Sequence, residues 1–181
     1  KVVAMLRARG LEKGDRIAWL GKNARHYFEL FYSAARLGIV MVPIGWRLAA
    51  PEIAYILGDT GAKLLFIDEG FGELADKACG QMDAAPPIVD TPTARAEIAA
   101  AQPGDFAAAG ADDAVLQLYT SGTTGNPKGA LGTHRNLLGG GCVRCAGHAI
   151  QRSFLAGDQQ HHQTPCDGKH HKDVDQDHAF V

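Results

Sequence analysis

The sequence predicts an α/β fold, a doubly wound and mainly parallel sheet with helices on both faces. Short runs that are apolar throughout alternate along the chain with segments whose apolar residues recur at helical spacing. Strands that are apolar on both faces are typical of parallel sheets, and right-handed crossovers then place helices on both sides. With 181 residues, 46% of them apolar, the chain can bury one core of ordinary size.

The first two helices and strands follow from local signals. A helix is expected over residues 2–9, because Gly10 suits the position just past a helix end. A strand is expected over 16–20. The next helix should take Asn23 as its N-cap and end at Gly38. Its apolar positions, at helical spacing, are Tyr27, Leu30, Phe31 and Ala34. The continuous apolar run 39–44 predicts the second strand.

The middle of the chain repeats this alternation. A helix over 52–57 should begin at Pro51, which suits the first turn, and end at Gly61. Residues 63–68 predict a strand and 71–79 a helix. Residues 83–113 are rich in Ala, Pro, Asp and Gly, which favours a loosely packed connection with one short helix over 93–101.

The last expected elements flank a polar segment. Residues 114–119 form an apolar run that predicts a buried strand, and residues 130–133 predict the second strand of a hairpin. A helix should open at His134. From 157 to 178 there is almost no large apolar side chain, so this segment should be disordered because burial cannot offset its ordering entropy.

The segment Tyr119–Gly129 concentrates hydroxyl side chains, glycines and one lysine directly behind a buried strand. Glycines let backbone amides approach a polyphosphate, hydroxyls donate hydrogen bonds, and a lysine adds a positive charge. We call residues 120–128 the phosphate loop. The residues expected to contact the nucleotide are Thr120, Ser121, Gly122, Thr123, Thr124, Gly125 and Lys128.

The phosphate loop does not fit the Walker pattern. That pattern requires a glycine, four residues and then Gly-Lys-Ser/Thr. Counted from Gly122, the position of the second glycine holds Pro127, and Lys128 is followed by Gly129. A plain surface turn rich in small polar residues is the other alternative, and the number of matching positions argues against it.

The loop is similar to the signature of the adenylate-forming superfamily, which runs aromatic-Thr-Ser-Gly-Ser/Thr-Thr-Gly-x-Pro-Lys-Gly. Upstream, the segments 14–18, 37–44 and 47–57 resemble the fatty-acid and related acid–CoA ligases of that superfamily. The resemblance covers roughly residues 1–141. Gly45 departs from the pattern, since a polar residue is expected there.

The resemblance implies ATP-dependent activation of a carboxylic acid, with a fatty acid favoured, to an acyl-adenylate and then to the acyl-CoA. It also implies Mg²⁺ as cofactor and coenzyme A as the second substrate. It implies a partial N-terminal AMP-binding domain over 1–141 and a tail foreign to the family over 142–181. The downstream adenine, ribose and C-terminal-domain motifs are not recognisable, so we expect a fragment, for example of a frameshifted gene, that is inactive alone. The sequence assigns no catalytic residue.

Several other residues suggest chemistry of their own. The pair Cys142 and Cys145, with histidines after it, suggests zinc, but the spacing is irregular and adventitious metal binding by a His-rich tail is favoured. His134 could be a catalytic base, although a helix-starting role is favoured. Asp112 and Asp113 could hold Mg²⁺, although a solvated turn is favoured.

Four aromatic residues lie within one expected helix. They could offer a stacking surface for a nucleotide, but at helical spacing a place in the core is favoured. These residues are Tyr27, Phe28, Phe31 and Tyr32.

Composition narrows the classes of partner. The net charge of −2 gives no basic excess for nucleic acid or an anionic membrane surface. No apolar stretch approaches the roughly 20 residues of a membrane span. Four scattered cysteines do not resemble a secreted disulfide framework, which favours the cytoplasm. Small-molecule substrates remain the expected partners, and the alternative function is a non-catalytic nucleotide- or metal-binding module.

Overall fold

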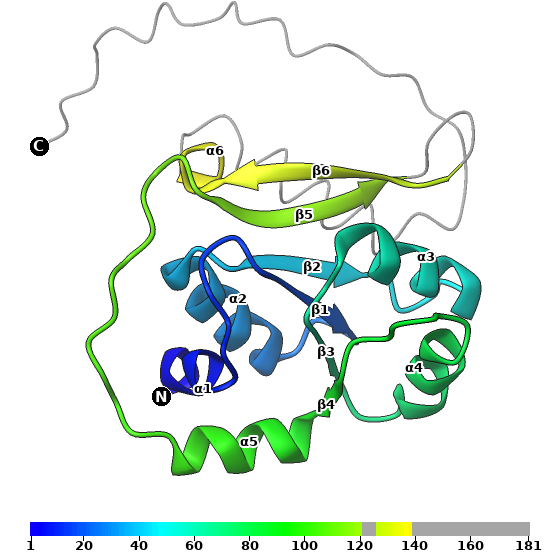
Figure 1. Ribbon diagram of the computed structural model, residues 1–181, viewed down its shortest axis with the longest axis horizontal. Helices are drawn as coiled ribbons and strands as arrows, with labels where there is room; N and C mark the ends of the chain where they lie inside the picture. Colours follow the sequence, from blue (N-terminus) through cyan, green and yellow to red (C-terminus); the bar gives the residue numbers. More distant parts are fainter. Residues whose placement is uncertain (121–125, 139–181) are drawn as a thin grey trace, which may run out of the picture.

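The computed structural model describes residues 1–120 and 126–138 (Figure 1). Helices and strands alternate through most of this part of the chain. In order, the elements are α1 (Val2–Ala8), β1 (Arg16–Leu20), α2 (Arg25–Leu37), β2 (Val40–Ile44), α3 (Ala50–Thr60), β3 (Leu64–Ile67), α4 (Gly72–Cys79), β4 (Ile88–Asp90), α5 (Thr91–Ala100), β5 (Ala114–Thr120), β6 (Lys128–Thr133) and α6 (His134–Leu138).

The six strands form one sheet in the order β4-β3-β1-β2-β5-β6. All neighbouring pairs are parallel except β5 and β6, which form an antiparallel hairpin. Strand β1 pairs with β2 from Arg16 opposite Val40 to Leu20 opposite Ile44. The mainly parallel sheet predicted from the continuous apolar runs is confirmed.

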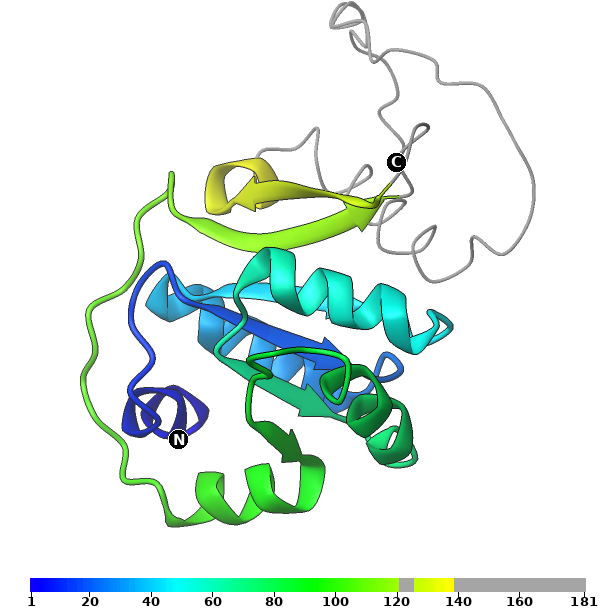
Figure 2. The ribbon, with the colours of Figure 1, turned by 45° about the vertical axis from the view of Figure 1, so that its right-hand side comes forward.

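Helices cover both faces of this sheet (Figures 1 and 2). On one face, α1, α2 and α5 pack on a core that includes Trp19, Leu30 and Phe66. On the other face, α3 and α4 pack on a second core that includes Ile53 and Ala75. The doubly wound arrangement expected from the sequence is therefore present.

The helix ends follow the glycine signals in three places. Gly10, Gly38 and Gly61 all adopt positive φ angles just past α1, α2 and α3. At the start of α2 the expectation was wrong, because Ala24 and not Asn23 is the N-cap and no side chain caps the helix. In α3 the Glu52 carboxylate instead accepts a hydrogen bond from the Ala49 amide at 2.8 Å.

The connection expected over residues 83–113 contains a strand that the sequence did not predict. Strand β4 is three residues long and pairs with β3 in parallel, with Phe66 opposite Val89. Its apolar run is only Ile88 and Val89, preceded by prolines, so periodicity gives too short a signal. Helix α5 then follows at once, with Asp90 as its N-cap.

The aromatic residues of α2 do not all enter the core. Tyr27 is buried at 3% exposure and Phe31 packs partly against the core. Phe28 and Tyr32 are 46% and 67% exposed, so the core assignment was wrong for these two. They lie on the outer side of the helix, against the rings of Tyr27 and Phe31.

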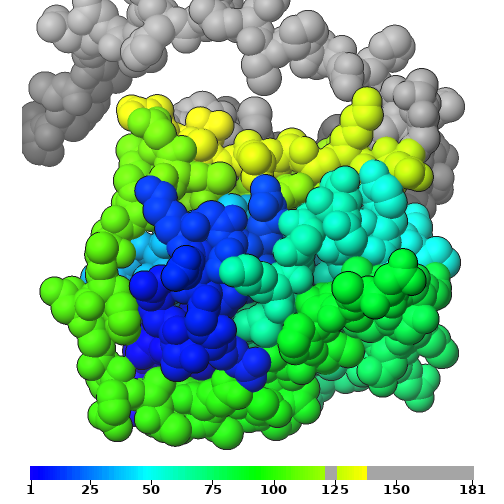
Figure 3. Space-filling model, in the orientation of Figure 1, coloured from blue at the N-terminus to red at the C-terminus, as the bar shows by residue number. Residues whose placement is uncertain are grey.

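The segment between α5 and β5 carries the chain from β4, at one edge of the sheet, to β5, near the opposite edge. On its way it runs along the outside of α1, at the surface of the molecule (Figure 3). Ala109 donates a hydrogen bond from its amide to the carbonyl of Arg36 at 2.8 Å, which fixes the segment against the end of α2. Among the described helices, none has the length and apolar character to cross a membrane.

Candidate functional site

The described ends of the phosphate loop lie opposite each other in the β5–β6 hairpin. Thr120, the last residue of β5, is the register partner of Lys128, the first residue of β6. Extending the pairing of Met41 with Leu116 places Thr120 just beyond Ile44, the last residue of β2. The loop therefore leaves and re-enters the sheet at its carboxyl edge, where ligands bind in open α/β sheets.

Thr120 and Lys128 are both exposed to solvent. Neither side chain makes a hydrogen bond or ion pair with another residue in the described part of the chain. The other predicted contact residues, Ser121, Gly122, Thr123, Thr124 and Gly125, lie outside the described residues. The structure therefore brings together the two described members of the predicted set.

A polar network supports the hairpin directly beneath the loop. The hydroxyl of Tyr119 donates to the carboxylate of Asp59 on α3 in a short hydrogen bond, and accepts one from Gln117 Nε2 at 3.1 Å. The Gln117 carbonyl oxygen accepts from Arg16 Nε at 2.9 Å. Gln117 is buried at 7% exposure, so its amide needs these partners. The network links β1, α3 and β5 one residue before Thr120.

Tyr119 remains a neutral phenol in this setting. Burial raises the pKa of Tyr119 well above its ordinary value, and the hydrogen bond and negative charge of Asp59 raise it further. The phenol hydrogen is thus held on the oxygen, where it can be donated to Asp59. Tyr119 binds the neighbouring carboxylate of Asp59 through its hydroxyl.

Gly129 fits closely under this network. It is the register partner of Tyr119. A Cβ atom on Gly129 would clash with Gln117 Nε2 and would lie 3.0 Å from Cζ of Tyr119. The lack of a side chain at Gly129 lets the Gln117–Tyr119 pair lie over the strand.

Two other candidates lie at the far end of the hairpin. His134 and the pair Asp112 and Asp113 adjoin the pairing of Ala114 with Thr133, the opposite end of β5 from Thr120. A seven-residue strand spans about 20 Å, which is too far for direct contact with the same phosphates. His134 is the first residue of α6, as expected, and its Nε2 lies 2.9 Å from the carbonyl oxygen of Ala35 on α2.

The two aspartates are held in ion pairs. Asp112 accepts two hydrogen bonds from Arg135, at 2.8 and 3.1 Å, and Asp113 pairs with Lys13 Nζ at 2.7 Å. These partners lower the pKa of both carboxyl groups. No three His, Cys, Asp or Glu side chains group together as a metal site within residues 1–120 and 126–138. The cysteines and histidines that suggested zinc, from Cys142 on, lie outside these ranges.

Sequence reasoning missed Asp59, Gln117 and Arg16 as parts of the site. Asp59 lies in a helix end that carries no chemical motif, 60 positions from Tyr119. Arg16 opens β1, 101 positions from Gln117. Only the pairing of β5 with β2 brings these residues together, and no local pattern reports it.

Comparison with known sequences gives consistent relatives. A sequence model of the family described as AMP-binding enzyme matches residues 1–166. The chain is 43% identical over 148 residues to a fatty acid–acyl-carrier-protein ligase of Streptomyces coeruleorubidus, covering 76% of this chain and 27% of the relative. It is 41% identical over 139 residues to a long-chain-fatty-acid–CoA ligase of Mycobacterium tuberculosis, covering 74% and 27%. The chain thus spans about a quarter of the length of these curated relatives.

Solved structures give the same result. A Mycobacterium tuberculosis fatty acyl CoA synthetase superposes with a TM-score of 0.68 at 34% identity, over 75% of this chain and 27% of that one. An anthranilate CoA ligase in complex with anthranoyl-AMP also superposes with a TM-score of 0.68, at 28% identity, over 75% and 27%. By its sequence match over most of its length and by these similarities, the chain belongs to the AMP-binding enzyme family.

Proposed function

We propose that the chain supplies the triphosphate-binding part of an enzyme that activates a carboxylic acid with ATP. In the first half-reaction the acid's carboxylate oxygen attacks the α-phosphorus of ATP, and the bond to pyrophosphate breaks to give an acyl-adenylate. In the second half-reaction a thiol attacks the acyl carbon, loses its proton and releases AMP. Relatives named as fatty acid ligases, a feruloyl-CoA synthase and a hydroxybenzoate–CoA ligase support acid activation as the common chemistry.

The observation that carries this proposal is the pairing of Thr120 with Lys128. It holds both ends of a hydroxyl- and glycine-rich loop at the carboxyl edge of the sheet. A hydroxyl and an ammonium group, both exposed and without described partners, are suited to phosphate oxygens. The proposal assigns hydrogen bonds with the β- and γ-phosphates to Thr120, Ser121, Thr123 and Thr124, and a charge contact to Lys128.

This arrangement acts on the leaving group. Negative charge accumulates on pyrophosphate as its bond to the α-phosphorus breaks, so preorganised donors there stabilise the transition state more than the ground state. The proposal includes Mg²⁺ bound together with ATP, where it would neutralise part of the charge on the phosphates. We assign a fatty acid as the acid and coenzyme A as the thiol, and the cytoplasm as the compartment.

The test is binding of ATP to the chain, followed by fluorescence of a labelled ATP analogue. Saturable binding that Mg-ATP and pyrophosphate displace, and that Lys128→Ala weakens several-fold, is expected. Lys77→Ala is the matched control, because this exposed lysine lies on α4, away from the β5–β6 hairpin (Figures 1 and 2). Equal binding by the Lys128→Ala chain and the unmodified chain would contradict the assignment of the loop.

Turnover is a separate question. We expect the chain alone to release pyrophosphate from ATP only at background rate with a panel of fatty and aromatic acids. Acid-dependent release above background would show that these residues suffice for adenylation. ATP binding without release is the outcome that the proposal requires. If the chain instead binds zinc and shows no binding of ATP, the alternative of a metal-binding module is favoured.

A further inference from the structure

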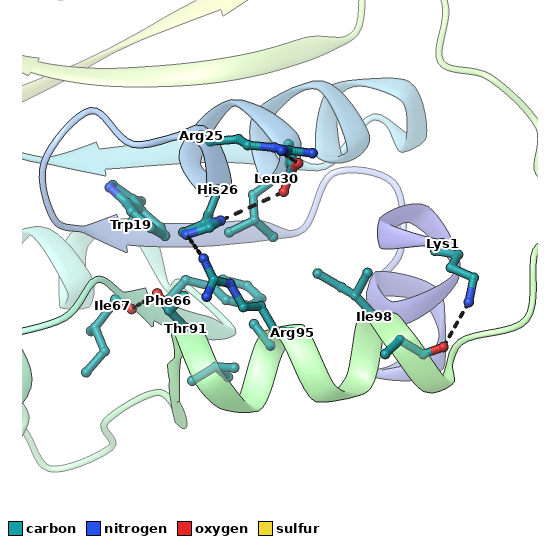
Figure 4. Close-up of a pocket in the computed structure, with 14 residues that line it drawn as sticks. Lys1, Trp19, Arg25, His26, Leu30, Phe66, Ile67, Thr91, Arg95 and Ile98 are labelled. Atoms are coloured by element: carbon teal, nitrogen blue, oxygen red, sulfur yellow. Dashed lines mark hydrogen bonds and ion pairs between the residues drawn. The ribbon is translucent and has the colours of Figure 1, made fainter.

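A cavity of about 340 Å³ opens between α2 and α5, over the carboxyl ends of β1 and β3 (Figure 4). Its floor is apolar. The floor residues are Trp19, Leu30, Phe66, Val89, Ala94 and Ile98. The volume lies at the small end of the range for ligand pockets, which suits a ligand with one ring or a short branched chain.

Hydrogen bonds to neighbouring elements hold α5 at the side of this cavity. At the start of α5, the Thr91 hydroxyl donates to the carbonyl of Ile67 at 3.1 Å. Toward its end, Glu97 accepts a hydrogen bond at 2.8 Å from Nε of Arg9, the residue that follows α1. Between these anchors the first turn of α2 reaches α5 through a hydrogen bond of 2.7 Å between Arg95 Nη2 and His26 Nε2.

The charge at the mouth of the cavity is incompletely balanced. Because Arg95 can only donate, His26 Nε2 must be the acceptor, which places the ring hydrogen of a neutral His26 on Nδ1. That nitrogen faces Glu29 Oε2 at 3.9 Å. Glu29 pairs with Arg25 at 2.7 Å, whereas Arg95 has no carboxylate partner among the described residues. The guanidinium of Arg95 therefore lies beside the apolar floor of the cavity with His26 as its neutral acceptor.

The position in the sheet also favours a ligand. The connection after β1 leads to α2 on one face, and the connection after β3 leads to α4 on the other. Open α/β sheets bind ligands at the carboxyl ends of strands where the connections diverge in this way. The cavity lies on the face of Trp19 and Phe66, while Tyr119 packs on the opposite face, so it is separate from the phosphate loop.

We propose that this cavity binds a small apolar carboxylate, with the carboxylate paired to Arg95 and the apolar body on Trp19 and Phe66. A carboxylate matches the planar guanidinium in geometry and neutralises its charge. The apolar body removes the floor from water. The site is independent of ATP binding, and its ligand class follows from the charge and the floor alone.

The chain provides its own probe for this test. It has two tryptophans, and Trp46 does not line the cavity, so a Trp46→Phe chain carries its single indole in the floor. Titration with hydrocinnamate should change Trp19 fluorescence and saturate, with a dissociation constant on the order of 0.1–1 mM. Two control ligands should each bind at least about fivefold more weakly than hydrocinnamate. One is the uncharged amide of this acid, which lacks the carboxylate for Arg95, and the other is acetate, which lacks the apolar body.

Variants separate the parts of the site. Arg95→Gln should weaken hydrocinnamate binding about five- to tenfold and leave binding of the amide unchanged. Ile98→Phe should fill the cavity and weaken both ligands. Lys77→Gln is the matched charge control and should change neither. Thermal unfolding of each variant, followed by circular dichroism, identifies any loss due to misfolding.

The proposal would be overturned by equal affinity for the acid and its amide, or by no saturable change at Trp19 in the folded Trp46→Phe chain. Full retention of hydrocinnamate binding by folded Arg95→Gln would overturn it as well. Binding of hydrocinnamate that Mg-ATP displaces would also contradict it, because the ligand would then occupy the nucleotide site. Failure of ATP binding leaves this result unaffected, so the two proposals are tested separately.

Discussion

The hydroxyl of Tyr119 on β5 donates a hydrogen bond to the carboxylate of Asp59 on α3. Tyr119 immediately precedes Thr120, the first residue of the phosphate loop. The helix thus fixes the point where the loop leaves the sheet, through a contact that involves no residue of the loop itself.

Removal of this hydroxyl should weaken the hairpin. In Tyr119→Phe the Asp59 carboxylate and the Gln117 amide each lose a partner, so we expect a loss of about 1–2 kcal/mol in the free energy of unfolding. Urea unfolding measures it. Tyr32→Phe, at a side chain that is 67% exposed, is the control and should change stability little. A loss of the same size in both variants would show that the Tyr119 network contributes nothing specific.

Two glycines of β6 should respond differently to the same added methyl group. Gly129→Ala forces Gln117 Nε2 away from Tyr119, and we expect a loss of about 1–2 kcal/mol and weaker ATP binding. Gly132→Ala brings its Cβ no closer than 3.9 Å to Leu116, so its stability should stay the same or rise slightly. Thermal unfolding and ATP titration compare the pair, and similar behaviour of both variants would contradict the close packing at Gly129.

In a complete enzyme that carries this chain, Thr124→Ala or Lys128→Ala should lower the adenylation rate by about ten- to a thousandfold. The loss of rate in Lys128→Ala should be near the lower end of this range, because a solvated ammonium group makes a weaker contact than a fixed donor. Thiol transfer to a supplied acyl-adenylate should fall much less, since pyrophosphate has already left. Rapid-quench measurement of each half-reaction tests this, and equal losses in both would assign the loop to folding alone.

Acid should remove a stabilising contact at Asp113. Lys13, with the amide of Gly110, lowers the pKa of this carboxyl group in the folded state. Its contribution to stability is therefore present above the unfolded pKa of about 3.9 and is lost as pH falls through the lower folded value. Asp113→Asn should lower the urea midpoint of unfolding at pH 7. The midpoint of this variant should then fall less than that of the unmodified chain when the pH is lowered below about 4. Asp83→Asn, at an exposed position, should leave the pH profile unchanged.

The β5–β6 hairpin could be predicted because its signals are local. An apolar run, a hydroxyl- and glycine-rich turn and a second short run follow one another directly, and the structure pairs Thr120 with Lys128 accordingly. Strand β4 could not be predicted in this way, since three residues carry no measurable alternation. Its existence depends on the exposed edge of β3, which only the folded sheet provides.

The side-chain partners could not be predicted for a different reason. Asp59 and Tyr119 are joined by the register of separate strands and a helix, and a single sequence holds no record of that register. The same limit explains Phe28 and Tyr32. Helical spacing identifies which residues share a face, but the position of neighbouring elements decides how far that face is covered.

The pairing between β2 and β5 determines which part of the sheet opens first. The β5–β6 hairpin is attached to the sheet through β2, and that pairing is defined only at Met41 opposite Leu116, whereas β1 and β2 pair along their whole lengths. Pro43 in β2 also has no amide hydrogen to donate. In amide hydrogen exchange, β5 and β6 should therefore lose protection together at a lower opening free energy than β1 and β3. The hairpin that carries the phosphate loop would then separate while the rest of the sheet stays folded. This separation breaks the hydrogen bond between Tyr119 and Asp59.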